Sequence, residues 1–269
     1  MITFKPGKSD SDKPIAKPPV GRSIVLYGPP FSGKTSSLQY DPSLRYAVLD
    51  FDKNTSVIEH MENVDIFGIG DWEEFLAVKE GIEKGTLNLG GQAIPMNYDV
   101  YVIDSFTSME EKIKAWVVNV YAPNRSREIK GKFGAQTDWA DLQNEEVETV
   151  REFQEMTRRP KSSINVMWIG HDMEMTNETD YSTKLQLRLQ GKYAAPGIMS
   201  AVDACFYMMK WKPDNEKHMQ FAIATLDNGA IRAEARLPVR ERLKMPAVIT
   251  YPKWGEIYRT LGATNLKEN

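Results

Sequence analysis

The 269-residue sequence contains a single cysteine, Cys205. One cysteine excludes a disulfide framework within the chain and a zinc site built from several cysteines. Cys205 lies in an apolar run, residues 204–209, which is typical of a small core residue in a protein kept in a reducing cytosol.

Long apolar runs and a strong charge of one sign are also missing. No apolar stretch approaches the roughly 18 residues that a membrane-spanning helix needs, and the N-terminus lacks the apolar core of a signal peptide. We therefore expect a soluble, intracellular protein. The 34 basic and 37 acidic residues leave a formal net charge of -3, so any binding of a polyanion must come from local patches.

One phosphate-binding motif is present. Residues 28–35 match G-x-x-x-x-G-K-[ST], and the apolar run at residues 24–27 predicts a buried strand before it. Lys34 is expected to reach the β- and γ-phosphates of a triphosphate, and the Thr35 hydroxyl to hold Mg²⁺. The predicted nucleotide contacts are Gly28, Pro29, Pro30, Phe31, Ser32, Gly33, Lys34, Thr35 and Ser36.

Three further predicted strands end in polar side chains that could reach the same ligand. These side chains are Asp50 and Asp52, Asp104, and His171, which follow predicted strands at residues 45–49, 98–103 and 163–170. The carboxyl ends of parallel strands form the ligand-binding edge of an α/β sheet, so we expect all of them beside the phosphate loop. In a phosphate-loop protein, a carboxylate in the place of Asp104 holds the Mg²⁺ shell opposite Thr35.

The order of elements predicts an α/β fold with a mainly parallel central sheet flanked by helices. Helices are expected at residues 71–84, 107–121, from a cap at Asp138 to 159, and at 254–261, with a short one after the phosphate loop. Predicted strands at 221–226 and 230–235 are separated by Asp-Asn-Gly, a hairpin turn signal, so an antiparallel C-terminal hairpin is expected.

The sequence lacks the motifs that are typical of two other classes of nucleotide-binding enzyme. There is no Asn-Lys-x-Asp run to read guanine, and no compact arginine lid follows Asp104 as a nucleoside-type kinase would need. An ATPase that activates water needs an acidic base near the γ-phosphate and a group that senses hydrolysis. Asp52 and His171 are suitably placed for these two tasks.

With these groups, residues 21–236 resemble the RecA-like ATPases, and among them the small phage RecA-core proteins (Sak-type) that anneal single-stranded DNA. The resemblance implies a RecA-like P-loop NTPase fold and Mg-dependent, DNA-stimulated ATP hydrolysis. It implies four catalytic residues: Lys34, Asp52 as base, Asp104 with Thr35 on the metal, and His171 as γ-phosphate sensor. The family usually has glutamate in the place of Asp52, and the longer recombinases have glutamine in the place of His171.

The resemblance also assigns two irregular stretches, residues 123–136 and 173–197, as DNA-binding loops. Their cationic side chains are Arg125, Arg127, Lys130 and Lys132 in the first, and Lys184, Arg188 and Lys192 in the second. Tyr181 and Tyr193 are candidates for stacking on bases. Composition alone explains either stretch equally well as a solvated insertion.

Relatives place a basic residue after the terminal hairpin, where it reaches a neighbour's nucleotide. Here Arg232 and Arg236 take that place, with exposed strand arginines as the alternative interpretation. We expect a homo-oligomeric ring or filament with nucleotide between protomers, and single-stranded DNA as partner. A single-strand DNA-binding protein is a further candidate partner, and no membrane is expected.

Prolines and a low apolar content predict a flexible N-terminal arm at residues 1–20. We expect an ATPase core at 21–240 and a C-terminal extension at 241–269 with a short helix. The expected location is the cytoplasm, or the host cell cytoplasm if a phage encodes the chain. Two alternatives stay open. One is a RecA-fold ATPase that acts on a protein partner, or as a nucleotide-dependent switch without DNA. The other is a nucleotide-binding module with little turnover, because Asp52 is one methylene shorter than glutamate.

Overall fold

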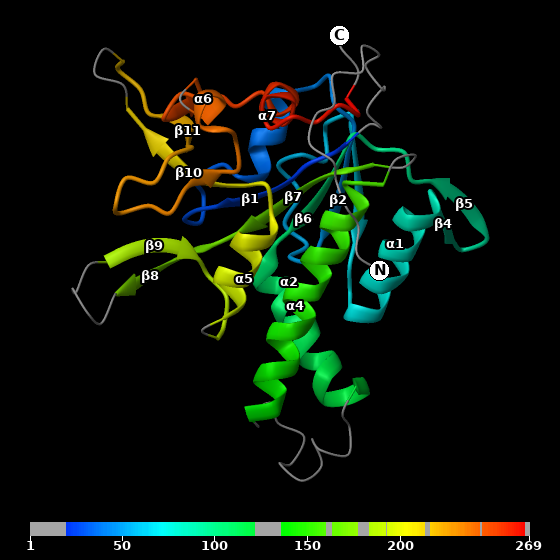
Figure 1. Ribbon diagram of the computed structural model, residues 1–269. Coiled ribbons are helices and arrows are strands. Elements are labelled where there is room, and N and C mark those ends of the chain that lie inside the picture. The colour runs from blue at the N-terminus through cyan, green and yellow to red at the C-terminus, as the bar shows by residue number, and fades with distance from the viewer. Residues whose placement is uncertain are drawn as a thin grey trace, which may run out of the picture.

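Strands far apart in the sequence assemble into one central sheet of nine strands (Figure 1). The computed structural model describes residues 20–121, 136–159, 163–176, 183–191, 193–212, 216–242 and 244–266. The strands of the sheet are β1 (Ser23–Tyr27), β2 (Tyr46–Asp50), β3 (Val64–Gly68), β6 (Val100–Asp104), β7 (Asn165–Gly170), β10 (Ala204–Trp211), β11 (Gln220–Ala224), β12 (Glu234–Ala235) and β13 (Val248–Thr250). Two hairpins lie outside it: β4 (Thr86–Leu89) with β5 (Gln92–Pro95), and β8 (Asp172–Thr176) with β9 (Thr183–Leu187).

The helices cover both faces of this sheet. They are the 3-10 helix η1 (Thr35–Tyr40), α1 (Trp72–Lys84), α2 (Phe106–Trp116) with the π-helical turn η2 (Val117–Tyr121), α4 (Gln136–Met156), α5 (Ala194–Ala201), α6 (Val239–Arg242) and α7 (Trp254–Thr260). Helices α1, α2, α4 and α5 contribute to the apolar cluster on one face, and η1 and α7 to the cluster on the other. None of the described helices is long and apolar enough to span a lipid bilayer.

The strand order is β13-β11-β10-β1-β7-β6-β2-β3, with β12 paired to β10. The six strands from β10 to β3 run parallel, and β11, β12 and β13 are antiparallel to their neighbours. The predicted mainly parallel sheet is therefore confirmed. Strand β7 lies between β1, which enters the phosphate loop, and β6, which ends in Asp104.

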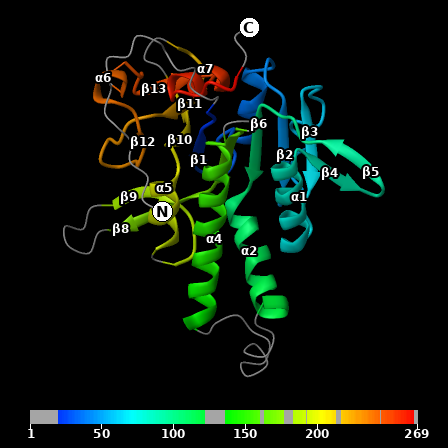
Figure 2. The same ribbon diagram turned by 45° about the vertical axis from the view of Figure 1, so that its right-hand side comes forward.

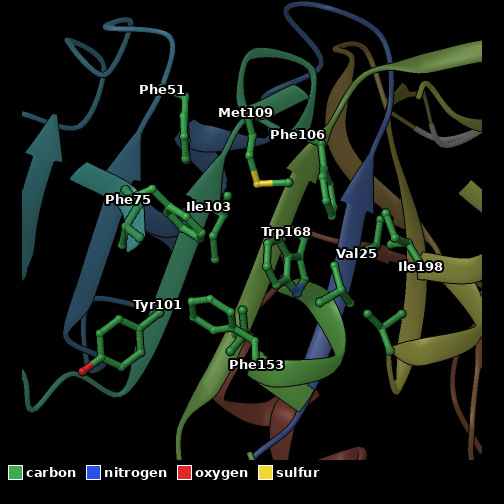
Figure 3. Packing of buried hydrophobic residues seen from close by; sticks show 14 of the residues in the cluster. Val25, Phe51, Phe75, Tyr101, Ile103, Phe106, Met109, Phe153, Trp168 and Ile198 are labelled. Carbon is green, nitrogen blue, oxygen red and sulfur yellow. The ribbon is translucent and has the colours of Figure 1, made fainter. Parts of the chain in front are cut away.

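Strand β1 shows why these residues form an interior strand. All five of its residues are fully buried. Successive side chains point to opposite faces, so Val25 and Tyr27 join one apolar cluster and Ile24 and Leu26 the other. Figure 3 shows Val25 among the aromatic side chains of the first cluster, close to Trp168 of β7.

The register aligns the carboxyl ends of four strands. Tyr27 pairs with Gly170, and Asp104 pairs with both Ile169 and Asp50. The residues that follow β1, β7, β6 and β2 consequently lie along one edge of the sheet. This is the edge at which open α/β sheets bind ligands.

The C-terminal helix α7 supports the element after the phosphate loop. Trp254 is fully buried and donates its indole N–H to the carbonyl oxygen of Ser37 in η1 at 3.2 Å. Asp41, directly after η1, accepts the backbone N–H of Gly255 at 2.7 Å. The C-terminal extension of the sequence prediction thus packs against η1 in the structure.

The antiparallel addition to the sheet is present, but the predicted pairing of its last strands is wrong. The sequence predicts a hairpin of residues 221–226 and 230–235, whereas β11 pairs with β10 and β13, and β12 pairs with β10. Asn228 accepts the backbone N–H of Ala230 at 3.1 Å, which is a typical side-chain turn. This turn directs the chain to β9, where the Leu185 N–H donates to the Ala230 carbonyl oxygen at 2.7 Å.

The stretch at residues 173–197, predicted as a loop with one alternating run, holds more regular structure. Strands β8 and β9 pair there as an antiparallel hairpin, and α5 begins at Ala194. Strand β8 (Asp-Met-Glu-Met-Thr) does alternate polar and apolar residues, but over only five residues, three of them exposed, and the sequence analysis did not assign it as a strand. In both views this hairpin lies to one side of the sheet, clear of α1 (Figures 1 and 2).

Two predicted helices differ in detail. The residues after the phosphate loop form a 3-10 helix, because Pro42 ends it before a longer α-helix can develop. Helix α4 begins at Gln136, so Asp138 is a buried residue of its first turn and not its cap. The predicted cap at Asp71 is confirmed, since its carboxylate accepts the N–H of Glu74 at 2.8 Å.

Candidate nucleotide-binding site

The phosphate loop leaves β1 at Gly28 and enters η1 at Thr35. A Cβ on Gly28 would lie 2.3 Å from the carbonyl oxygen of Met208 on β10, so a larger residue does not fit. Gly33 has a φ of +88°, and a Cβ there would meet the ring of Phe221 at 2.7 Å. Both glycines therefore let the loop pack closely against two strands of the sheet.

Lys34 folds back over its own loop. Its side chain is buried, and Nζ donates to the carbonyl oxygens of Gly28 at 2.9 Å and Pro29 at 2.8 Å. Burial lowers the pKa of Lys34, and nearby carboxylates, Asp104 foremost, oppose that shift. The ammonium group is thus held inside the loop, where the phosphates of a nucleotide would be bound.

The other predicted nucleotide contacts belong to the same loop. Pro30, Phe31 and Ser36 line the cavity described below. Phe31 has a φ of +60° and is 89% exposed at the tip of the loop. Ser32 is buried, and its hydroxyl has no hydrogen-bond partner among the described residues, so it is available to a ligand.

Thr35 and Asp104 meet across the cavity floor. The Thr35 hydroxyl donates to Asp104 Oδ2 at 2.5 Å. Burial raises the pKa of Asp104 to about 6, and the charges of Asp52 and Asp50 add to that rise. A hydroxyl and a carboxylate are the oxygen ligands that Mg²⁺ prefers, and Mg²⁺ takes its remaining ligands from water and substrate phosphates. These two residues fit a Mg²⁺ bound together with a nucleoside triphosphate.

Asp50 builds the turn that presents Asp52. The buried Asp50 carboxylate accepts the backbone N–H groups of Asp52 at 3.0 Å and Lys53 at 2.8 Å, and the Thr55 hydroxyl at 2.9 Å. Asp52 itself is exposed and lines the cavity. The sequence analysis grouped Asp50 with Asp52 but missed this supporting role, for which the turn pattern Asp-x-Asp-Lys-x-Thr is the available signal.

His171 follows β7 and is the fourth predicted group at this edge. Its Nδ1 atom is buried without a hydrogen-bond partner among the described residues. Burial lowers the pKa of His171, and the positive charge of Lys34 contributes to the shift. The ring is therefore mainly neutral near pH 7, with one N–H to donate and one nitrogen that accepts.

One cavity of about 410 Å³ is lined by residues that follow or end β1, β2, β6 and β7. Lys34, Asp52, Asp104 and His171 all line it, so the structure brings the four predicted catalytic side chains together. The sequence analysis did not assign four further lining residues: Asn54, Val57, Ser105 and Ile169.

The candidate DNA-binding residues are only partly described. Arg125, Arg127, Lys130, Lys132, Lys192 and Tyr181 lie outside the described residues. Lys184 is exposed on β9 and lies 3.7 Å from Asp227. Arg188 is exposed directly after β9, and its backbone N–H donates to the carbonyl oxygen of His171 at 2.8 Å. Tyr193, before α5, is 73% exposed.

Arg232 and Arg236 lie away from the nucleotide cavity of their own chain. Both are exposed and line a second cavity of about 280 Å³, together with Asp203 and Glu234. Ala204, the first residue of β10, also lines this cavity, so it lies toward the sheet edge opposite the phosphate loop. Neither arginine lines the nucleotide cavity of its own chain.

Comparisons with known proteins concern most of the chain. A family model described as an AAA domain matches residues 21–228. A crystal structure of a KaiC-like protein from the hyperthermophilic archaeon Pyrococcus horikoshii OT3 aligns with 77% of this chain and 78% of its own, at 9% identity and a TM-score of 0.40. None of the curated proteins matches the chain.

Proposed function

The chain belongs to the AAA domain family and is a P-loop ATPase domain of the RecA-like fold, and from this premise we propose that it binds and anneals single-stranded DNA under the control of ATP. The observation that carries the proposal is the position of His171. It lines the nucleotide cavity, and the exposed hairpin β8–β9 begins at the next residue. A change at the γ-phosphate can therefore reach the hairpin within one residue.

In this proposal the chain's own groups divide the work. The loop amides and Lys34 bind the phosphates of ATP, and Asp52 orients the attacking water and accepts its proton. The water oxygen bonds to the γ-phosphorus as the bond to the β-phosphate oxygen breaks. When bound by Thr35 and Asp104, Mg²⁺ would neutralise charge on the phosphate oxygens.

His171 donates its ring N–H to a γ-phosphate oxygen and loses that contact when phosphate leaves. The hairpin then changes its order, which alters its affinity for DNA. Arg188, exposed next to His171, supplies a cation beside the nucleotide edge, and the exposed Tyr193, before α5, supplies a stacking surface. DNA affinity and nucleotide state are thereby linked.

The proposal includes a homo-oligomer, ring or filament, in which Arg232 and Arg236 of one protomer reach the nucleotide of the next. It places the protein in the cytoplasm, or in the host cytoplasm if a phage encodes it, in keeping with its single buried cysteine. A single-strand DNA-binding protein is a candidate partner at the DNA.

One experiment tests the central claim. ATP turnover is measured with and without single-stranded DNA for the wild type and for Lys34→Ala, with Lys84→Ala on the exposed face of α1 as matched control. We expect turnover that DNA stimulates, a loss of about a hundredfold or more in Lys34→Ala, and no change in Lys84→Ala. DNA-independent turnover that survives Lys34→Ala rejects the proposal.

A second candidate function is an ATPase that acts on a protein partner or as a switch without DNA. It is favoured by the ion pair of Lys184, whose charge is shared with Asp227 instead of being free for a phosphate. A salt titration separates the two functions, because phosphate contacts make the affinity for single strands fall steeply with salt. Turnover without any salt-dependent DNA binding favours the second function.

A further inference from the structure

Two tyrosines lie beneath the phosphate loop and face the hairpin. Tyr27 is the last residue of β1, and Tyr207 is its register partner on β10. Both are buried, and their rings meet edge to face with centroids 5.2 Å apart. The proposed mechanism uses neither of them.

The Tyr207 hydroxyl reaches the first residue of β8, and the Tyr27 hydroxyl reaches the middle of β9. Tyr207 donates to Asp172 Oδ2 at 2.9 Å, and Asp172 is the first residue of β8. Tyr27 Oη lies 3.1 Å from the carbonyl oxygen of Leu185 on β9 and 2.6 Å from that of Arg232, and it can donate its one proton to either. Burial raises the pKa of Tyr207, so its hydroxyl keeps the proton that it donates.

Other contacts lie at the root of the hairpin and along β9, where the Leu185 N–H donates to the Ala230 carbonyl oxygen at 2.7 Å and the Leu185 carbonyl oxygen accepts the Arg232 N–H at 3.2 Å. The Arg188 N–H donates to the His171 carbonyl oxygen, and the Leu187 side chain is buried against Gly170, where a Cβ would come within 2.3 Å of it. The outer residues of both strands are exposed. Strand β9 is therefore held mainly by backbone bonds, whereas β8 is held by the side-chain bond from Tyr207 to the Asp172 carboxylate, which is of the strong type.

The same tyrosines adjoin the phosphate loop. Tyr27 precedes Gly28, and Met208, which follows Tyr207, is the residue whose carbonyl oxygen packs against Gly28. Asp172 in turn follows His171. The bond between Tyr207 and Asp172 thus connects β10, which packs against the phosphate loop, to the residue that follows His171.

We propose that Tyr207 is a positioning residue of the nucleotide site, which acts through Asp172 to fix both His171 and the direction of the β8–β9 hairpin. Tyr27 contacts the second strand of the hairpin at the Leu185 carbonyl oxygen, beside its shorter contact with the Arg232 carbonyl oxygen. The effect on turnover rests on the proposed function, because it requires His171 to act on the γ-phosphate. The effect on the hairpin does not.

The test compares Tyr207→Phe with Tyr101→Phe. Tyr101 is also buried, and Tyr101→Phe also removes one hydroxyl bond, to the Met96 carbonyl oxygen, but Tyr101 lies on β6, away from the hairpin. Two quantities are measured: amide hydrogen exchange of peptides covering residues 172–188, and the kcat and KM of ATP hydrolysis. In Tyr207→Phe we expect exchange at the hairpin to rise about tenfold and kcat to fall about tenfold with KM kept within about twofold. Tyr101→Phe leaves both quantities as in the wild type.

Substitutions at Asp172 complete the experiment. Asp172→Asn keeps an acceptor oxygen and should retain much of the wild-type protection from hydrogen exchange. Asp172→Ala should show the same increase in hairpin exchange and the same decrease in kcat as Tyr207→Phe. The double variant Tyr207→Phe/Asp172→Ala should add nothing to either single change, because both remove one bond. Wild-type hairpin exchange in Tyr207→Phe, or an equal change in Tyr101→Phe, overturns the proposal. If the wild type shows no turnover, the proposed function fails, and the exchange data still decide on Tyr207.

Discussion

The nucleotide edge of the sheet and the β8–β9 hairpin are neighbours with opposite construction. At the edge, Lys34, Asp50 and Asp104 are each less than 10% exposed; Asp50 and Asp104 end strands that are buried throughout, and Lys34 lies in the loop that follows another such strand. In the hairpin, five of the ten strand residues are exposed, and the strands lie outside the central sheet. Groups that bind and polarise a triphosphate gain from fixed places, whereas an element that responds to it must move without unfolding the core. The predictions that follow test this contrast.

The largest effect is expected from Asp52→Ala. Loss of a general base typically lowers turnover by 10² to 10⁴, so we expect a decrease of about a hundredfold or more. ATP affinity should stay within about threefold, because the phosphates are bound by the loop and Lys34. Steady-state turnover and equilibrium binding of a fluorescent ATP analogue measure the two quantities.

Glu59→Ala is the matched control for that substitution. Glu59 is an exposed carboxylate from the same segment, and it does not line the nucleotide cavity. It should leave turnover unchanged. Turnover in Asp52→Ala at the wild-type level would show that another group activates the water, and the nucleotide edge would then lack its assigned base.

The second effect concerns the packing of the phosphate loop. A methyl group on Gly28 would meet the Met208 carbonyl oxygen at 2.3 Å. This oxygen belongs to the backbone of β10 and cannot easily move away. We expect Gly28→Ala to lower the free energy of unfolding by about 1–3 kcal/mol and to weaken ATP binding. Gly68→Ala, at a glycine with no atom within 4 Å of the added methyl, should change neither quantity. Urea unfolding of both variants measures the difference; an equal loss in both would mean that close packing is not what Gly28 provides.

The third effect is a pH dependence from Asp104. Burial raises its pKa to about 6, with the charges of Asp52 and Asp50 contributing. Mg²⁺ needs the ionised carboxylate, so Mg-dependent turnover at limiting Mg²⁺ should fall about tenfold between pH 7 and pH 5. Excess Mg²⁺ should shift the midpoint to lower pH. If turnover at limiting Mg²⁺ does not change between pH 7 and pH 5, Asp104 is not a ligand of the metal.

Without Mg²⁺, Asp104 should make the free energy of unfolding decrease with rising pH, which is opposite to its effect on turnover. A carboxyl group whose folded pKa is raised contributes stability below its unfolded pKa near 4, and this contribution is lost as pH rises through 6. In urea, without Mg²⁺, the wild type should lose stability relative to Asp104→Asn between pH 4.5 and pH 7. If the wild type instead becomes more stable relative to Asp104→Asn between pH 4.5 and pH 7, the pKa of Asp104 is not raised in the folded protein.

The sequence predicts a region well when its contacts join residues close in sequence, and poorly when they join distant residues. The phosphate loop is contiguous, and Asp52, Asp104 and His171 each follow an apolar run, so parallel pairing alone brings them together. The hairpin depends on partners distant in the chain. Tyr207 and Asp172 are 35 residues apart, and Tyr27 and Leu185 are 158 apart. No local pattern reports such pairs.

The turn at Asn228 shows the same limit inside the sheet. Its composition correctly indicates a reversal, because the Asn side chain bonds to backbone N–H groups close in sequence. What the sequence could not give is the choice of partner strand. β11 pairs with β13, which comes 24 residues later, and the stretch after the turn pairs with β9 and β10. Pairing is decided by which apolar surfaces remain to be covered, a property of the whole fold.

The smallest effect concerns the exposed half of the hairpin, where Lys184 lies 3.7 Å from Asp227. Both side chains are more than 40% exposed, so a double-mutant cycle of Lys184→Ala and Asp227→Ala should give a coupling below about 1 kcal/mol in unfolding experiments. Single-strand DNA binding should respond differently. If Lys184 contacts a phosphate, Lys184→Ala reduces the slope of log affinity against log salt by about 1, and Asp227→Ala strengthens binding by freeing the lysine. Equal salt slopes in the wild type and both variants would remove Lys184 from the DNA surface and leave the hairpin to contact protein.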